Sequence, residues 1–329
     1  MKTNHKTTIE DSAGVYAYLL NDATLKTVLE GVENEQLLIE IIEFLIPGKH
    51  IASISKPNKE KHGLTISEKV TIFDLLCQDK DTGEEFLVEV QNAPDKTFKD
   101  RALYYSLVPV REQLERKLTK AFGKKEKEQQ EQEQKKEKSD VEEDVEKKRE
   151  KMDYSIRPVY VISLVNFDLS HDSPDALENG YVSRYELRNK RNGELMTEAL
   201  NFVFVEMDRL PYEKDEYAKC KTRLERFIFG FKYMHTFTEF PKELEDDPLL
   251  GKLACAAELA NMSVLQREQY DKIMEDALAR LSEINTAHEE GREERNREVA
   301  MTMLSDGVDP ALVSKYTGLT LEEIGALQA

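Results

Sequence analysis

The stretch FLVEVQ, Phe86–Gln91, is an apolar run that contains a carboxylate and an amide. Side chains alternate along a β-strand, so Glu89 and Gln91 share one face with Leu87, while the other face is wholly apolar. An isolated carboxylate in an apolar setting is costly unless it is paired or bound to a cation. The stretch therefore predicts a buried strand whose polar pair has a function.

The residues before this strand predict a hairpin with it. KVTIFDLLC, Lys69–Cys77, is apolar on both faces, as a central strand is, and QDKDTG supplies turn residues. Asp74 lies on an apolar face of the first strand, and Glu89 lies on the second. Two carboxylates on adjacent strands repel each other, and Mg²⁺ or Mn²⁺ would stabilise both, polarise a phosphodiester and activate water. The alternative is an ordinary hairpin with both acids facing solvent, and their spacing does not separate the two interpretations.

Composition limits the class of protein. The chain has 329 residues, of which 40% are hydrophobic, enough for a sizeable core. Its three cysteines are far apart, which argues against a disulfide framework and a zinc site and fits a reducing cytoplasm. No apolar run approaches the roughly 20 residues that span a bilayer, and the N-terminus has no apolar signal core. We therefore expect a cytoplasmic protein without a membrane segment.

The charge balance weighs against a nucleic-acid partner. The formal net charge is −18, whereas binding to phosphates usually needs a basic surface. Acidic residues in tails and at a metal site also contribute to this sum, and a bound divalent cation would offset some of them. Net charge therefore does not exclude DNA.

Changes in composition divide the chain into four parts. Residues 1–119 and 153–245 carry apolar strand and helix patterns and are interpreted as the two parts of one core. Residues 120–152 are mostly Lys, Glu and Gln and cannot bury enough surface to offset their ordering entropy, so we expect a disordered or solvated single-helix insertion. Residues 246–329 are almost wholly helical in pattern.

Three further segments define the expected core. NEQLLIEIIEFLIP predicts a helix that begins after Asn34 and ends at Pro47. RPVYVISLVNFDL (157–169) and ALNFVFVEMDRL (199–210) predict strands. Together they indicate an α/β (α+β) fold with a mixed central sheet flanked by helices, followed by a helical C-terminal region.

The end of the chain predicts two short helices around a glycine turn, similar to a helix-turn-helix. Asp309 is an N-cap with a proline at the first helical position, and Thr320 with Glu323 forms a capping box. Lys315 is the main basic residue there, so the pattern favours packing or homo-oligomerisation through this tail over reading of the major groove.

A family resemblance sharpens these expectations. The run VTIFDLLCQDKDTGEEFLVEVQNAPDKTFKDRALYYSL resembles the core of the PD-(D/E)XK nuclease superfamily, and more closely the recombination-promoting nuclease (Rpn)/putative transposase family. The similarity continues through YSIRPVYVISLVNFDL, LNFVFVEMDRL and LSDGVDPALVSKYTGLTLEEI. It implies a restriction-endonuclease-like core and a bacterial DNA endonuclease that depends on Mg²⁺ or Mn²⁺ and is linked to recombination or mobile elements.

The resemblance also assigns site residues. Asp74 matches the metal-binding aspartate of the motif, Glu89 matches its second acid, and the backbone carbonyl of Val90 is a further metal ligand. Gln91 occupies the position of the superfamily lysine, as it commonly does in the Rpn family. A lysine can help to deprotonate water and stabilise negative charge, whereas an amide only forms hydrogen bonds. Two alternatives therefore stay open: a catalytically weak or inactive nuclease fold that acts as a DNA-binding or protein-interaction module, and a structural protein that oligomerises through its tail.

Two accessory residues complete the prediction. An acid on the first core helix often joins such sites, and Glu43 is favoured over Glu40 for this role, with surface positions for both as the alternative. Arg101 lies on one helical face with Tyr105 and is a candidate for contact with a DNA phosphate. For the tyrosine, packing of the helix against the sheet is the competing interpretation.

Overall fold

The computed structural model describes residues 14–55, 60–61, 71–72, 75–130, 154–171 and 173–327. The chain forms two compact units, Met1–Tyr270 and Asp271–Ala329. The first unit thus includes the helices between residue 246, where the sequence places the start of the C-terminal region, and Tyr270.

A six-stranded mixed sheet forms the centre of the first unit, with the order β1-β4-β5-β6-β8-β7. In chain order the strands are β1 (Ile54–Ser55), β4 (Leu75–Asp79), β5 (Glu85–Gln91), β6 (Val159–Val165), β7 (Val182–Glu186) and β8 (Leu200–Glu206). The three central strands β5, β6 and β8 are parallel. Strand β4 pairs antiparallel with β5, β7 pairs antiparallel with β8, and β1 pairs antiparallel with β4. This arrangement confirms the predicted mixed sheet and brings the carboxyl ends of three buried strands to one edge.

The predicted hairpin is present. Strand β4 pairs with β5 from Leu75↔Val88 to Gln78↔Glu85. Gly83 closes the turn with a φ of +75°, a backbone conformation that favours glycine. A separate two-stranded sheet joins β2 (Glu60–Lys61) to β3 (Thr71–Ile72). The predicted strand 69–77 is therefore described as two pieces, and Asp74 lies outside the described residues.

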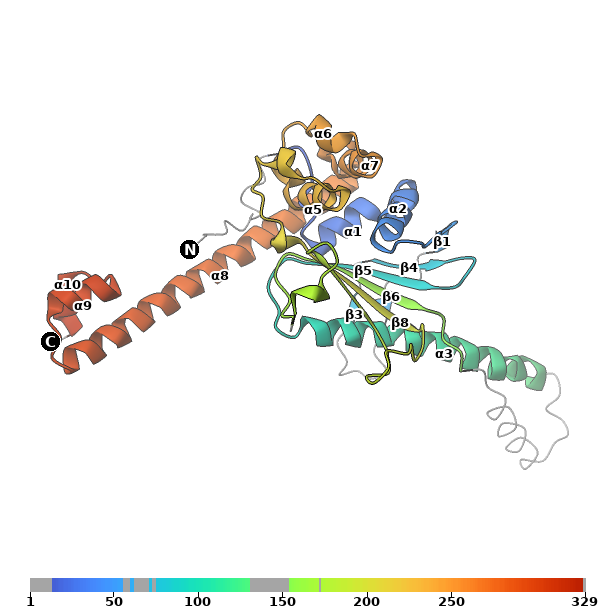
Figure 1. Cartoon of the computed structure of the whole chain (residues 1–329), viewed down its shortest axis with the longest axis horizontal. Helices are drawn as coiled ribbons and strands as arrows, with labels where there is room; N and C mark the ends of the chain where they lie inside the picture. The colour runs from blue at the N-terminus through green and yellow to red at the C-terminus, as the bar shows by residue number, and fades with distance from the viewer. Residues whose placement is uncertain are drawn as a thin grey trace, which may run out of the picture. The chain divides into compact units, whose positions relative to one another are not determined.

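Helices cover both faces of the sheet (Figure 1). On one face lies α3 (Phe98–Gln130), which runs through Pro109. Phe98 and Ala102 of this helix pack on Leu87, Val161 and other residues of the same sheet face. Five described helices lie on the side of the opposite face in Figure 1: α1 (Asp22–Leu29), α2 (Glu35–Leu45), α5 (Arg223–Tyr233), α6 (Lys242–Glu245) and α7 (Pro248–Ala257). The central strands are therefore covered on both sides.

Several predicted elements are confirmed, and others were missed. Helix α2 starts after Asn34, and strands β6 and β8 fall inside the predicted segments. Helix α1 and strand β7 were not predicted. Helix α3 extends to Gln130, into the charged insertion, and the rest of that insertion lies outside the described residues.

The second unit ends in two short helices, as predicted. The long helix α8 (Val264–Ser305) leads into it and is followed by α9 (Pro310–Thr317) and α10 (Leu321–Leu327). Asp309 caps α9 by accepting from the Ala311 N–H, and Thr320 and Glu323 exchange the hydrogen bonds of a capping box. The apolar core of the unit is formed by Ala300, Val313, Leu319 and Ile324. Among the helices described, none is long and apolar enough to cross a bilayer.

Candidate active site at the carboxyl end of β5

Glu89 is a largely buried carboxylate near the end of β5, one of the three central strands. Its side chain is 13% exposed. Burial raises the pKa of Glu89 to about 7, against the opposing effect of the nearby Arg101 charge and its hydrogen bond, while the charges of Asp22 and Asp95 raise it further. The carboxylate is thus held in an environment that disfavours its ionised form, which is typical of acids with a chemical role.

Arg101 of helix α3 is the main partner of this carboxylate. Its Nη2 atom donates to Glu89 Oε1 at 3.1 Å and to Gln91 Oε1 at 2.6 Å, and its Nη1 atom donates to Asp95 Oδ2 at 3.0 Å. The guanidinium lies 5.0 Å from the centre of the Phe98 ring. The two polar side chains of FLVEVQ, Glu89 and Gln91, therefore both bind the guanidinium of Arg101.

The second carboxylate oxygen, Glu89 Oε2, is buried and has no hydrogen-bond partner among the described residues. Buried polar atoms nearly always have a partner, and those without one often mark a site that binds a ligand or an ion. A carboxylate oxygen is the type of ligand that Mg²⁺ and Mn²⁺ prefer. The donor chemistry at Glu89 therefore fits a hard divalent cation.

A second buried carboxylate, Glu206 at the carboxyl end of β8, differs from Glu89. It bonds to His171 and accepts from the Leu169 N–H and from Arg209 Nε, both at 2.8 Å. Both oxygens of Glu206 are satisfied, so this carboxylate holds the loop after β6 in place. Of these two acids, only Glu89 has an oxygen without a hydrogen-bond partner among the described residues.

Asp22 is a candidate site residue that the sequence analysis missed. It opens helix α1 after the N-cap Asn21, is exposed, and lies close enough to Glu89 for its charge to raise the pKa of that carboxylate. The sequence signal for this helix was an Asn-Asp pair that precedes Leu25, Val28 and Leu29, which have the spacing of a buried helical face. The first core helix is therefore α1, whereas Glu40 and Glu43 lie on the second.

Three polar side chains join the segment before α1 to the ends of two strands. The Tyr18 hydroxyl accepts from Asn92 Nδ2 at 2.8 Å, and Asn92 Oδ1 accepts from Asn166 Nδ2 at 2.8 Å. The Asn166 N–H in turn donates to the backbone carbonyl of Gln91 at 2.9 Å. This chain of hydrogen bonds fixes the start of α1, and with it Asp22, relative to the end of β5.

The other predicted site residues have different surroundings. Glu43 Oε1 accepts from the Ile51 N–H at 2.7 Å, and Glu40 pairs with Lys252, so both carboxylates have partners away from Glu89. Val90 follows Glu89 on β5 and is buried. Gln91 Nε2 donates to the Ala93 carbonyl at 2.8 Å.

Within the ranges that the structure describes, no three His, Cys, Asp or Glu side chains form a group able to hold a metal ion. Glu89 and Asp22 are near enough for their charges to interact, but these two acids alone do not make such a group. Asp74, the residue that the sequence predicts as a metal ligand, is among the residues left undescribed.

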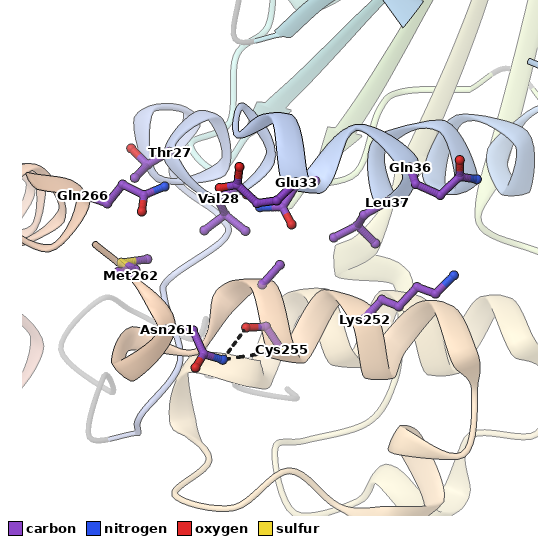
Figure 2. Close-up of a pocket in the computed structure, with 12 residues that line it drawn as sticks. Thr27, Val28, Glu33, Gln36, Leu37, Lys252, Cys255, Asn261, Met262 and Gln266 are labelled. Carbon is purple, nitrogen blue, oxygen red and sulfur yellow. Dashed lines mark hydrogen bonds between the residues drawn. The ribbon is translucent and has the colours of Figure 1, made fainter. Parts of the chain in front are cut away.

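A pocket of about 510 Å³ lies elsewhere in the first unit, between helices α1 and α2 on one side and α7 on the other (Figure 2). Its lining includes Gln36, Lys252 and Cys255 but neither Glu89 nor Arg101. Lys252 is paired with Glu40, and the Asn261 amide donates to the carbonyl and sulfur of Cys255. The pocket is therefore separate from the candidate site.

A family model described as the PD-(D/E)XK nuclease family transposase matches residues 19–130 and 138–287. The chain belongs to this family. A model of the C-terminal HTH domain of the Rpn/YhgA-like nuclease family matches residues 293–329, which include helices α9 and α10. No curated protein and no solved structure matched the chain. As a PD-(D/E)XK nuclease family member, the chain carries Glu89 in the central strand of the matched region and a helix-turn-helix at its C-terminus.

Proposed function

We propose that this chain is a metal-dependent endonuclease that hydrolyses phosphodiester bonds in DNA, in a reaction linked to recombination or mobile elements. The observation that carries the proposal is the buried Glu89 with one vacant carboxylate oxygen, in a chain of a nuclease family. We expect Mg²⁺ or Mn²⁺ to be held by Glu89, Asp74 and the backbone carbonyl of Val90, with Asp22 as a further acid.

The proposal requires Asp74 to lie across from Glu89. The last described pair of the β4–β5 ladder is Leu75↔Val88, one residue from each of these acids. Directly opposed residues of an antiparallel pair place their side chains on the same face, with Cβ atoms about 4.5–5.5 Å apart. Two carboxylates at that separation would bind one divalent cation.

Each polar group has a distinct part in the proposed reaction. Glu89, Asp74 and the carbonyl of Val90 would hold the divalent cation, which would supply polarisation of the phosphodiester and activation of water. Glu89 and Asp74 supply the negative charge that holds the cation, and Asp22 adds to it. Gln91, which has no basic atom, orients the attacking water by hydrogen bonding.

DNA as the substrate is supported by the family and by its C-terminal domain. The matched families are described as a nuclease family transposase and as the HTH domain of a nuclease family. The net charge of −18 implies that DNA binding depends strongly on the divalent cation and is weak without it.

Nicking of supercoiled plasmid tests the proposal. Wild-type protein is expected to nick the plasmid only when Mg²⁺ or Mn²⁺ is present, and Asp74→Ala and Glu89→Ala are expected to abolish nicking. Glu178→Ala is the matched control, since it removes an exposed acid that pairs with Arg184. Equal residual cutting by wild type and by both site variants would point to a contaminant and exclude the nuclease.

A specific observation supports a second candidate function. Both ends of the Gln91 amide are already bonded, to Arg101 and to Ala93, and the family resemblance assigns to this residue the position of the superfamily lysine. A protein with this site could bind DNA without cutting it. If fluorescence anisotropy detects DNA binding while neither metal gives cleavage, the chain is a DNA-binding module of the nuclease fold.

A further inference from the structure

We infer that Arg101 is an internal competitor of the metal ion. In the metal-free protein its guanidinium holds Glu89 and Gln91, and a divalent cation binds more tightly at Glu89 when Arg101 releases that carboxylate and stays on Asp95. The inference rests on the proposed function, because it requires a metal ion at Glu89.

The competition follows from the contacts of one nitrogen atom. Arg101 Nη2 donates to Glu89 Oε1 at 3.1 Å and to Gln91 Oε1 at 2.6 Å. These oxygens belong to the two polar side chains that share one face of β5. A cation at the vacant Glu89 Oε2 would lie close to the positive charge bound to Oε1 of the same carboxylate, so the two cations repel and each weakens the binding of the other.

Asp95 gives the released guanidinium a second partner. Arg101 Nη1 donates to Asp95 Oδ2 at 3.0 Å, and Asp95 Oδ1 accepts from the N–H and hydroxyl of Thr97, both at 2.8 Å. Asp95 is therefore fixed in position independently of Arg101. The guanidinium of Arg101 also lies over two aromatic rings, with its carbon 5.0 Å from the centre of Phe98 and 5.8 Å from the centre of Tyr105. Arg101 can thus leave Glu89 and keep a charge partner.

The chain supplies a matched control for this contact. Arg116 lies on the same helix, α3, and pairs with Glu85 of the same strand, β5, whose side chain is only 1% exposed. This pair lies at the start of the strand, four residues before Glu89. Substitution of Arg116 removes an equivalent arginine–glutamate pair without changing the charge next to Glu89.

Mg²⁺ binding to the full chain without DNA tests the inference. Isothermal titration calorimetry at mildly alkaline pH compares wild type with Arg101→Met, Arg101→Lys and Arg116→Met. Arg101→Met is expected to bind Mg²⁺ on the order of tenfold more tightly, within the range of typical coupling between two sites. Arg101→Lys keeps the positive charge but loses the guanidinium that contacts two acids at once, so its Mg²⁺ affinity is expected to lie between those of Arg101→Met and wild type. The Mg²⁺ affinity of Arg116→Met is expected to match that of wild type.

A double-mutant cycle tests the role of Asp95. Asp95→Asn is expected to weaken Mg²⁺ binding more in the wild-type background than in Arg101→Met, because only the former has a guanidinium to relocate. Equal effects in both backgrounds would remove Asp95 from the inference. The shift of the melting temperature on addition of Mg²⁺ gives a second measurement of binding. If Arg101→Met does not fold, Arg101→Lys is compared with wild type in its place.

The outcomes separate the inference from the proposed function. If Glu89→Ala abolishes Mg²⁺ binding but Arg101→Met binds no more tightly than wild type, the inference is wrong and the metal site stands. If Glu89→Ala binds Mg²⁺ as well as wild type does, or neither wild type nor Arg101→Met binds it, both are wrong.

Discussion

Arg101 of helix α3 and Glu89 of strand β5 form an ion pair, with Nη2 and Oε1 separated by 3.1 Å, at the carboxyl end of the central strand. The side chains are only 29% and 13% exposed, so the pair is weakly screened by water. Arg101 keeps Asp95 as a partner when Glu89 is replaced, whereas loss of Arg101 would leave Glu89 as an uncompensated charge. The free energy of unfolding and the metal affinity of this protein should therefore both respond to Glu89 and its neighbours.

Replacement of Glu89 by Gln should stabilise the metal-free protein at high pH. Because burial raises the pKa of Glu89 from 4.5 to about 7, the folded state binds this proton more tightly than the unfolded state. The contribution of Glu89 to stability therefore falls as pH rises from 4.5 to 7. Relative to wild type, Glu89→Gln should gain up to about 3 kcal/mol above pH 7 and little below pH 4.5. Urea denaturation with a chelator across this range measures the difference, and a gain that does not vary with pH would contradict the assignment.

Divalent cations should stabilise the protein in a pH-dependent manner. Mg²⁺ binds ionised Glu89, so it should raise the melting temperature more above pH 7 than at pH 5, where the carboxyl is largely protonated. A ligand at 100 times its Kd contributes about 2.7 kcal/mol. Differential scanning fluorimetry with and without Mg²⁺ measures this shift. Glu89→Gln should lose most of it, and a shift retained in full would place the metal elsewhere.

Asp22→Asn should weaken metal-dependent nicking with little effect on folding. Asp22 is exposed at the first turn of α1, where a negative charge contributes only about 0.3–1 kcal/mol to the helix. Its charge acts on Glu89, so its loss should reduce nicking on the order of 10- to 100-fold at limiting metal concentration. Plasmid assays over a range of Mn²⁺ concentrations measure this change. Glu30→Gln, at the other end of the same helix, is the control, and equal effects of the two substitutions would rule out a special role for Asp22.

Asn92→Leu should destabilise the protein and also impair the site. The substitution leaves the Tyr18 hydroxyl and the Asn166 amide without the partners they have now, at a cost of about 1–3 kcal/mol for each buried group left unsatisfied. Urea denaturation measures the loss of stability, with the exposed Asn261→Ala as the control. If Asn92→Leu is as stable as wild type, the three side chains do not hold the start of α1.

Local sequence patterns predicted the parts of the fold that depend on neighbouring residues. Alternation in FLVEVQ and the turn residues before it predicted the β4–β5 hairpin, and capping residues predicted both ends of α9. Helix α1 has only eight residues, too few to be stable alone, and its pattern was correspondingly weak.

Side-chain contacts between segments far apart in the chain could not be predicted from local sequence patterns. Arg101 was predicted to contact a DNA phosphate, a role that stays a prediction. Its bond to Glu89 depends on how α3 packs on the sheet. The pairing of His171 with Glu206 likewise depends on the loop after β6 folding back onto the end of β8. Sequence spacing carries no signal for such contacts, so Asp22 and His171 were not recognised.

The most direct test of a metal-dependent nuclease site at Glu89 is the rate of plasmid nicking, measured against Mn²⁺ concentration for wild type and Glu89→Gln. The two side chains are nearly equal in size, so the comparison isolates the negative charge. The account predicts a saturable, metal-dependent rate for wild type and no rate above background for Glu89→Gln at any Mn²⁺ concentration. A Glu89→Gln protein that nicks plasmid at the wild-type rate would contradict it.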